Sequence, residues 1–62
     1  MQLDAIPDCT ELIRRNPQDA VAFFNRGYIY GELGEFDAAI ADFTKAIAAF
    51  RQRLALAQLH LR

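Results

Sequence analysis

The chain repeats part of its own sequence at a distance of 34 residues, and this period limits the folds open to it. Shifting the sequence by 34 aligns residues 5–15 with residues 39–49, and the match is lost where Asn16-Pro17 falls on Phe50-Arg51. A period of this length is typical of stacked helix-turn-helix units, so one and a half units are present. The identical pairs are Ala5 with Ala39, Ile6 with Ile40, Asp8 with Asp42, Thr10 with Thr44, and Ile13 with Ile47.

Local signals predict three helices. Residues 4–15 carry apolar side chains at helical spacing. A second helix is expected over residues 19–33, with Asp19 as its N-cap, and Gly34 follows it as a residue suited to positive φ. A third helix begins near Phe36. The predicted fold class is all-α, an antiparallel helix-turn-helix of three helices with the last one long.

Together these residues make the chain resemble the tetratricopeptide repeat family. The family pattern sets a large aromatic residue, a glycine, a tyrosine, an alanine, a phenylalanine and a closing proline at fixed spacing. The resemblance implies one domain, 1–62, made of a half-repeat helix (4–15), a full repeat (19–33 and 36–50) and a helical extension (51–62). The residues that carry it are Phe23, Gly27, Tyr30, Gly34, Phe36, Ala39, Phe43 and Ala46, with Pro17 as the closing proline of the half repeat.

This resemblance explains why a glycine stands at position 27, but it does not explain the glycine at position 31. Glycine inside a helix costs about 0.5–1 kcal/mol relative to alanine. In the family, the positions of Gly27 and Ala39 are those where two antiparallel helices approach closely. Gly31 is outside the family pattern, and a place on the open helix face is the interpretation left for it.

Three residues depart from the family pattern. Arg26 stands where an aliphatic residue is usual, Cys9 replaces an aromatic residue, and Arg51 replaces the closing proline. Without that proline the third helix has no local stop. Two arrangements follow: a loop over residues 50–53 with a short capping helix after it, or one helix from about residue 36 to residue 61. The composition of the last segment favours the continuous helix, because Ala, Gln, Leu and Arg all propagate helices.

The composition offers few residues for a catalytic or metal-binding site. In 62 residues Cys9 is the only cysteine and His60 the only histidine, which excludes an intramolecular disulfide and predicts no metal site. We expect no catalytic residue and no cofactor, and therefore no enzyme. No apolar run is long enough to span a membrane and the N-terminus lacks the features of a signal peptide, so a cytoplasmic protein is expected. Three arginines in residues 51–62 are thin evidence for nucleic acid, and neither nucleic acid nor a membrane is an expected partner.

The resemblance also implies a surface for binding other proteins. Members of the family bind peptides or partner proteins on the concave side of the repeat array, which is lined mainly by the first helix of each unit. An alternative is that Phe24 and Tyr28 only pack on the first helix or on a second copy of the chain. The implied binding residues are Val21, Phe24, Asn25, Tyr28 and Glu32.

A second surface follows from the unstopped third helix. Apolar residues recur in steps of three and four from Ile40 to Leu61, across the place where the family would turn. The second helix can cover little more than half of a helix that long, so we expect a homodimer with contacts from Phe50, Leu54, Ala57 and Leu61. Two hypotheses stay open. One is an interaction module that binds a protein or peptide and also self-associates. The other is a purely structural homodimerisation element with no other ligand.

Overall fold

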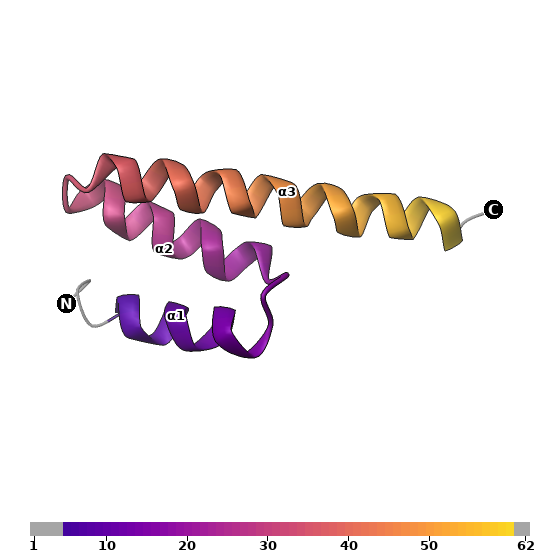
Figure 1. Ribbon diagram of the computed structural model, residues 1–62, viewed down its shortest axis with the longest axis horizontal. Helices are drawn as coiled ribbons and strands as arrows, with labels where there is room; N and C mark the ends of the chain where they lie inside the picture. The colour runs from indigo at the N-terminus through magenta and orange to yellow at the C-terminus, as the bar shows by residue number, and fades with distance from the viewer. Residues whose placement is uncertain (1–4, 61–62) are drawn as a thin grey trace.

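The computed structural model describes residues 5–60. Three helices follow one another: α1 over Ala5–Arg15, α2 over Ala20–Glu32 and α3 over Phe36–His60. α2 lies between the other two and packs on both, and each helix runs antiparallel to the one before it (Figure 1). The prediction of an all-α, antiparallel three-helix fold with a long last helix is confirmed.

A short turn built on Pro17 reverses the chain between α1 and α2. The Asp19 amide donates to the Asn16 carbonyl at 3.0 Å, which closes a β-turn with Pro17 at its second position. The Asn16 side chain accepts from the Gln18 amide at 3.1 Å, a bond that asparagine makes readily in turns. The Asp19 carboxylate accepts from the Ala22 amide at 3.1 Å, so the predicted N-cap of α2 is confirmed.

Gly34 ends α2 through a left-handed backbone conformation. Its φ is +83°, a value that a residue with a side chain rarely adopts. The Gly34 amide donates to the Gly31 carbonyl at 3.1 Å, and the Glu35 amide donates to the Tyr30 carbonyl at 2.9 Å. These two bonds are those of a Schellman motif, which satisfies the last carbonyls of a helix. The predicted positive φ at Gly34 is confirmed.

Gly27 lies where α2 and α3 approach closely. A methyl group at Gly27 would be 3.0 Å from two carbons of the Phe43 ring and 3.2 Å from the Ala39 carbonyl oxygen. Both distances are shorter than ordinary van der Waals contact, so the predicted close approach is confirmed. Gly31 differs, because a methyl group there would be 3.9 Å from the Ala39 Cβ. Gly31 is half-buried against α3, and its expected place on an open face is wrong.

α3 runs for 25 residues without a break, which is the continuous alternative. At about 1.5 Å per residue it is roughly 37 Å long, whereas the 13 residues of α2 span roughly 20 Å. α3 therefore reaches well beyond the start of α2 (Figure 1), and the molecule measures 44 × 21 × 14 Å. We call residues 51–60 the α3 extension. Its side chains from Arg51 to Leu59 are all exposed.

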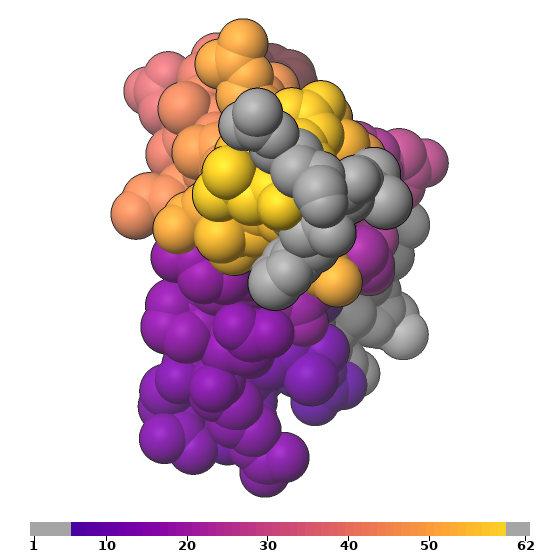
Figure 2. All heavy atoms as spheres, turned by 90° about the vertical axis from the view of Figure 1, so that its right-hand side faces the viewer, coloured from indigo at the N-terminus to yellow at the C-terminus, as the bar shows by residue number. Residues whose placement is uncertain are grey.

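The core is thin and consists mainly of small residues. Buried alanines let two helices approach closely, but each removes little apolar area from water. Figure 2, which views the molecule from the end of α3, shows α3 on one side and the end of α1 with the following turn on the other. Large apolar side chains remain exposed on both α2 and α3. The buried apolar residues are Cys9, Ala20, Ala22, Phe23, Ile29, Ala39, Ala46 and Ala49.

Candidate functional site

An apolar groove lies between α2 and the middle of α3. It has a volume of about 510 Å³, room for several apolar side chains. The rings of Phe24 on α2 and Phe43 on α3 lie 5.4 Å apart at an angle of 46°, a favourable geometry for an aromatic pair. This pair links the two helices that form the groove. The lining residues are Ala20, Val21, Phe24, Phe43, Ala46, Ile47, Phe50 and Arg51.

The groove continues along the α3 extension in a second hollow of about 430 Å³. This hollow shares Ala20, Val21 and Phe50 with the first. We call the two hollows together the α2/α3 groove. Its lining is apolar except for two arginines, whose aliphatic stems can cover apolar surface while their charged heads reach water. The residues that only the second hollow adds are Arg53, Leu54 and Ala57.

The sequence of α3 explains why the groove is apolar. Along α3, one stripe of small residues, which includes Ala39, Ala46 and Ala49, is buried. The neighbouring stripe advances in steps of four and three and carries larger side chains, so it lies along one side of the helix. α3 therefore packs with its small residues and leaves its large apolar residues accessible. Those large residues are Phe43, Ile47, Phe50 and Leu54.

The structure brings together residues from both surfaces expected from the sequence. Val21 and Phe24 of the implied binding set line the groove, and so do Phe50, Leu54 and Ala57 of the expected self-association set. The other implied binding residues lie exposed on α2, outside the groove lining: Asn25, Tyr28 and Glu32. Leu61 lies outside the described residues.

Phe24 and Tyr28 are both accessible to a partner. Their exposed fractions are 54% and 55%. The aromatic contact that Phe24 makes is with Phe43 of α3, the helix on the opposite side of α2 from α1. Packing on α1, one of the alternatives for these two side chains, leaves more than half of each uncovered.

The sequence analysis missed an ion pair that joins all three helices. The Arg26 guanidinium donates from Nε to Asp42 Oδ2 at 2.7 Å and from Nη2 to Asp42 Oδ1 at 2.9 Å. Its Nη1 donates to Thr10 Oγ1 of α1 at 3.1 Å. The guanidinium also lies 5.8 Å from the centre of the Phe23 ring and 5.9 Å from that of Tyr30, within reach of a cation–π interaction. Arg26 on α2 therefore contacts both neighbouring helices.

The Arg26–Asp42 pair is largely shielded from water. The side chain of Asp42 is 7% exposed and that of Arg26 is 19% exposed. The hydrogen bonds that Arg26 donates to the Asp42 carboxylate raise the pKa of Arg26, which stays charged. A signal for the pair was present in the sequence: Asp42 lies in register with Ala39, Ala46 and Ala49 on the buried stripe, where a charge requires a partner.

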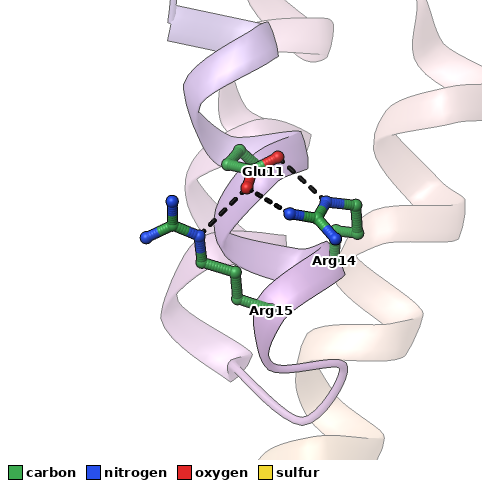
Figure 3. Close-up of polar contacts among 3 residues, drawn as sticks. All are labelled: Glu11, Arg14 and Arg15. Atoms are coloured by element: carbon green, nitrogen blue, oxygen red, sulfur yellow. Dashed lines mark hydrogen bonds and ion pairs between the residues drawn. The ribbon is translucent and has the colours of Figure 1, made fainter.

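A second ion-pair cluster, at the C-terminal end of α1, is largely open to water. Glu11 accepts from Arg14 Nη2 at 2.6 Å and from Arg15 Nε at 3.0 Å (Figure 3). Hydrogen bonding to Arg14, and then to Arg15, lowers the pKa of Glu11. Both arginines are also well placed for the negative end of the helix dipole. These contacts support the last turn of α1 and belong to no pocket.

The described residues offer few groups for other chemistry. Over residues 5–60, no three His, Cys, Asp or Glu side chains gather in a way that could hold a metal ion. Cys9 is buried and free, as expected of a small core residue. Within the same part of the chain, no helix combines the length and apolar character needed to cross a membrane.

Comparison with protein families agrees with this geometry. The model of the tetratricopeptide repeat matches residues 20–52, which is more than half of the chain. The matched segment begins with α2, contains the Gly34 turn and ends in α3 just after the family's closing proline position, Arg51. Comparisons with curated proteins and with solved structures give no match. The repeat is a non-catalytic module that generally mediates protein–protein interaction. Matched segment, helix order and turn chemistry agree, and the chain belongs to the tetratricopeptide repeat family.

Proposed function

We propose that the chain is a protein-interaction module that binds a peptide or partner protein on α2. The proposal is carried by Val21 and Phe24, which line an apolar groove of about 510 Å³ on the helix that the family uses for binding. Binding sites are commonly apolar hollows with a few polar groups at their edge. On α2 those polar groups are Asn25, Tyr28 and Glu32, all of them exposed.

The ligand chemistry follows from the two parts of this surface. Phe24, which is more than half exposed, offers an anchor site for a large apolar side chain of the peptide. The Asn25 amide can donate and accept, which suits a peptide backbone or a polar side chain. The Tyr28 hydroxyl adds a second polar contact one turn further along α2. A peptide with one apolar anchor next to an uncharged polar residue therefore fits this surface.

The test uses peptides selected from a displayed library on the wild-type chain. We expect Phe24→Ala, Asn25→Ala and Tyr28→Ala each to weaken binding of the selected peptides about tenfold or more, measured by fluorescence anisotropy. Because all three side chains are exposed, far-ultraviolet circular dichroism should stay unchanged. Gln18→Ala, in the turn before α2, is the control and should bind like wild type. Peptides that bind wild type and all three α2 variants equally would show that α2 is not the binding surface.

A purely structural homodimerisation element is the second candidate, and the α3 extension favours it. Phe50, Leu54 and Ala57 are exposed, apolar and lined up in the groove. Burying such side chains contributes about 25 cal/mol per Å² of apolar area, so a partner surface would stabilise them considerably. Light scattering after size exclusion gives the mass. A chain that is monomeric at high micromolar concentration does not self-associate, and a dimer that selects no peptide is a purely structural element.

A cytoplasmic location is part of the same proposal. A single free thiol, Cys9, is typical of a chain that folds in a reducing compartment. Expression of a fluorescent fusion and fractionation of the cells would test it.

A further inference from the structure

We infer that a second copy of the chain occupies the α2/α3 groove. Each copy places its α3 extension in the groove of the other copy. The two α3 helices would pack antiparallel about a two-fold axis at the level of Gln52. This inference rests on the proposed self-association and specifies its geometry. The sequence alone is equally compatible with a parallel coiled coil and with an antiparallel or exchanged pairing.

The spacing of four residues of the apolar stripe on α3 is symmetric about Gln52. These residues, Ile47, Phe50, Leu54 and Ala57, follow one another in steps of three, four and three, so this part of the series reads the same in both directions. In an antiparallel pair centred on Gln52, each of the four has a counterpart in the second copy, and Ile40 lies outside the paired segment. A self-complementary patch of this kind is what a two-fold dimer requires. The facing pairs among the described residues are Phe50 with Leu54 and Ile47 with Ala57.

The internal repeat indicates what covers this stripe. On α1, Ile6 and Ile13 are half-buried and Cys9 is buried, in the helix that α2 packs on. Their equivalents on α3, at a distance of 34 residues, include Ile40 and Ile47, which are 63% and 59% exposed. Ile40 and Ile47 are thus less covered than Ile6 and Ile13, whereas Phe43, the equivalent of Cys9, is half-buried. Among the described residues, no helix covers the outer side of α3 as α2 covers α1.

The α3 extension holds the sequence position of that missing helix. The 34-residue shift aligns Ala20, the first residue of α2, with Leu54. However, α3 does not turn at Arg51, so residues 54–60 continue straight and cannot fold onto the stripe of their own chain. The extension of a second copy can lie there, because an antiparallel partner brings its residues 54–60 alongside residues 44–50.

The area available is close to what a dimer needs. Seven apolar side chains of each copy would be covered, and at their observed exposures this removes on the order of 600 Å² per copy from water, near the ~800 Å² per partner of a standard interface. The pairing also brings Arg51 and Arg53 of both copies near the axis. Both side chains line the groove and are exposed, so salt screens their mutual repulsion. The seven side chains are Val21, Phe24, Phe43, Ile47, Phe50, Leu54 and Ala57.

The test is disulfide trapping between two single-cysteine variants, Ile47→Cys and Ala57→Cys, both made with Cys9→Ala. In the proposed pairing these two positions face each other, so the mixed variants should cross-link under mild oxidation. Each variant alone should not, because residues 47 of the two copies are about 15 Å apart along the axis, beyond the ~7 Å that a disulfide bridges between Cα atoms. Cross-linking of each variant with itself, with no product in the mixture that joins position 47 to position 57, would establish a parallel pair and overturn the inference.

A second pair of variants removes the dependence on oxidation. Ile47→Lys and Ala57→Glu each place a charge on the apolar stripe, and each alone should be monomeric. Their equimolar mixture should form a mixed dimer, because Lys then faces Glu and the remaining Ala57 faces the remaining Ile47. A mixture that stays monomeric while wild type is dimeric overturns this geometry and leaves self-association standing. A monomeric wild type overturns both, and peptide binding at Asn25 and Tyr28 is tested separately.

Discussion

Gly27 and Gly31 lie one helical turn apart on α2 and meet α3 at different distances. A methyl group at Gly27 would crowd the Phe43 ring at 3.0 Å and the Ala39 carbonyl oxygen at 3.2 Å, and the carbonyl belongs to a backbone that cannot rotate away. A methyl group at Gly31 would make ordinary contact with Ala39. Only Gly27 is therefore required by the packing of the two helices.

The two glycines provide a matched pair of variants. We expect Gly31→Ala to stabilise the fold by about 0.5–1 kcal/mol, because alanine restricts the unfolded chain and fits the native space. Gly27→Ala should instead destabilise it by about 1 kcal/mol, and Gly27→Leu by about 1–3 kcal/mol or more, through overpacking. Urea denaturation followed by circular dichroism measures all three. Equal stability of Gly27→Ala and Gly31→Ala would mean that the close contact has no energetic importance.

Arg26 and Asp42 allow a second prediction at the residue scale. Arg26→Leu removes one partner of a shielded pair, and the uncompensated Asp42 carboxylate should cost roughly 2–4 kcal/mol. The double variant Arg26→Leu/Asp42→Leu should recover most of this loss, because apolar residues of similar volume can replace such a pair. Glu11→Gln, in the largely open cluster on α1, should have no measurable effect. A double variant as unstable as Arg26→Leu would contradict the prediction.

The pH dependence of this pair follows from the direction of the Arg26 shift. The pKa of Arg26 is raised in the folded state. The stabilisation from this shift is therefore fully present at any pH below the pKa of the unfolded state, and it is lost only as the pH rises through the pKa of the folded state. The pKa of arginine in the unfolded chain already lies well above pH 10. Titration of Arg26 should therefore leave the difference in unfolding free energy between wild type and Arg26→Leu unchanged between pH 6 and pH 10. Urea denaturation of both chains, repeated at steps of ~1 pH unit, measures this difference.

At the scale of single elements, α3 shows what a missing proline does. The turn after α1 contains Pro17, and the chain reverses there within four residues. At the equivalent place after the first half of α3 the chain has Arg51, and the helix continues to His60. The side chains of the α3 extension from Arg51 to Leu59 are all exposed, so packing within the described residues supports this part of the helix little. A partner that covered the extension would stabilise its helical form.

Arg51→Pro tests this account of α3. Proline at position 51 removes a helical hydrogen bond and clashes with the carbonyl of Ile47, so α3 should end near Phe50. We expect about ten residues to lose their helical structure and the dimer to be lost, while α1, α2 and the Gly34 turn stay folded. Circular dichroism and light scattering measure the two effects, and Arg51→Ala is the control that keeps both helix and mass. A dimer that persists in Arg51→Pro would show that the extension is not the interface.

Taken as a whole, the molecule was more predictable in its turns than in its surface. Asp19 and Gly34 are recognisable because N-caps and positive-φ positions depend on residues next to each other in sequence. The Arg26–Asp42 pair joins residues 16 apart on two helices, and only the relative rotation of those helices brings them together. The sequence also does not predict that the two expected surfaces share one groove. It places Val21 and Phe24 on one surface and Phe50 and Leu54 on another, because it does not show that α2 starts beside the middle of α3.

Leu54 and Leu56 give a prediction at this scale with an internal control. Their exposed fractions are nearly equal, 51% and 52%, but Leu54 lines the groove and Leu56 does not. Leu54→Glu should therefore abolish the dimer, while Leu56→Glu should leave the mass unchanged. Sedimentation equilibrium at several concentrations gives the dissociation constants. Equal effects of the two substitutions would indicate nonspecific association of exposed leucines, without a defined interface.

The groove has a consequence for how much of the protein is available at any moment. If both proposed occupants bind, Val21 and Phe24 cannot contact a peptide and the extension of a second copy at the same time, so the two would compete. By mass action, once most chains are paired, the concentration of open grooves rises only as the square root of the total concentration. Doubling expression would then add far less than twice the binding capacity. A chain of this design would limit its own activity when abundant, with no inhibitor other than itself.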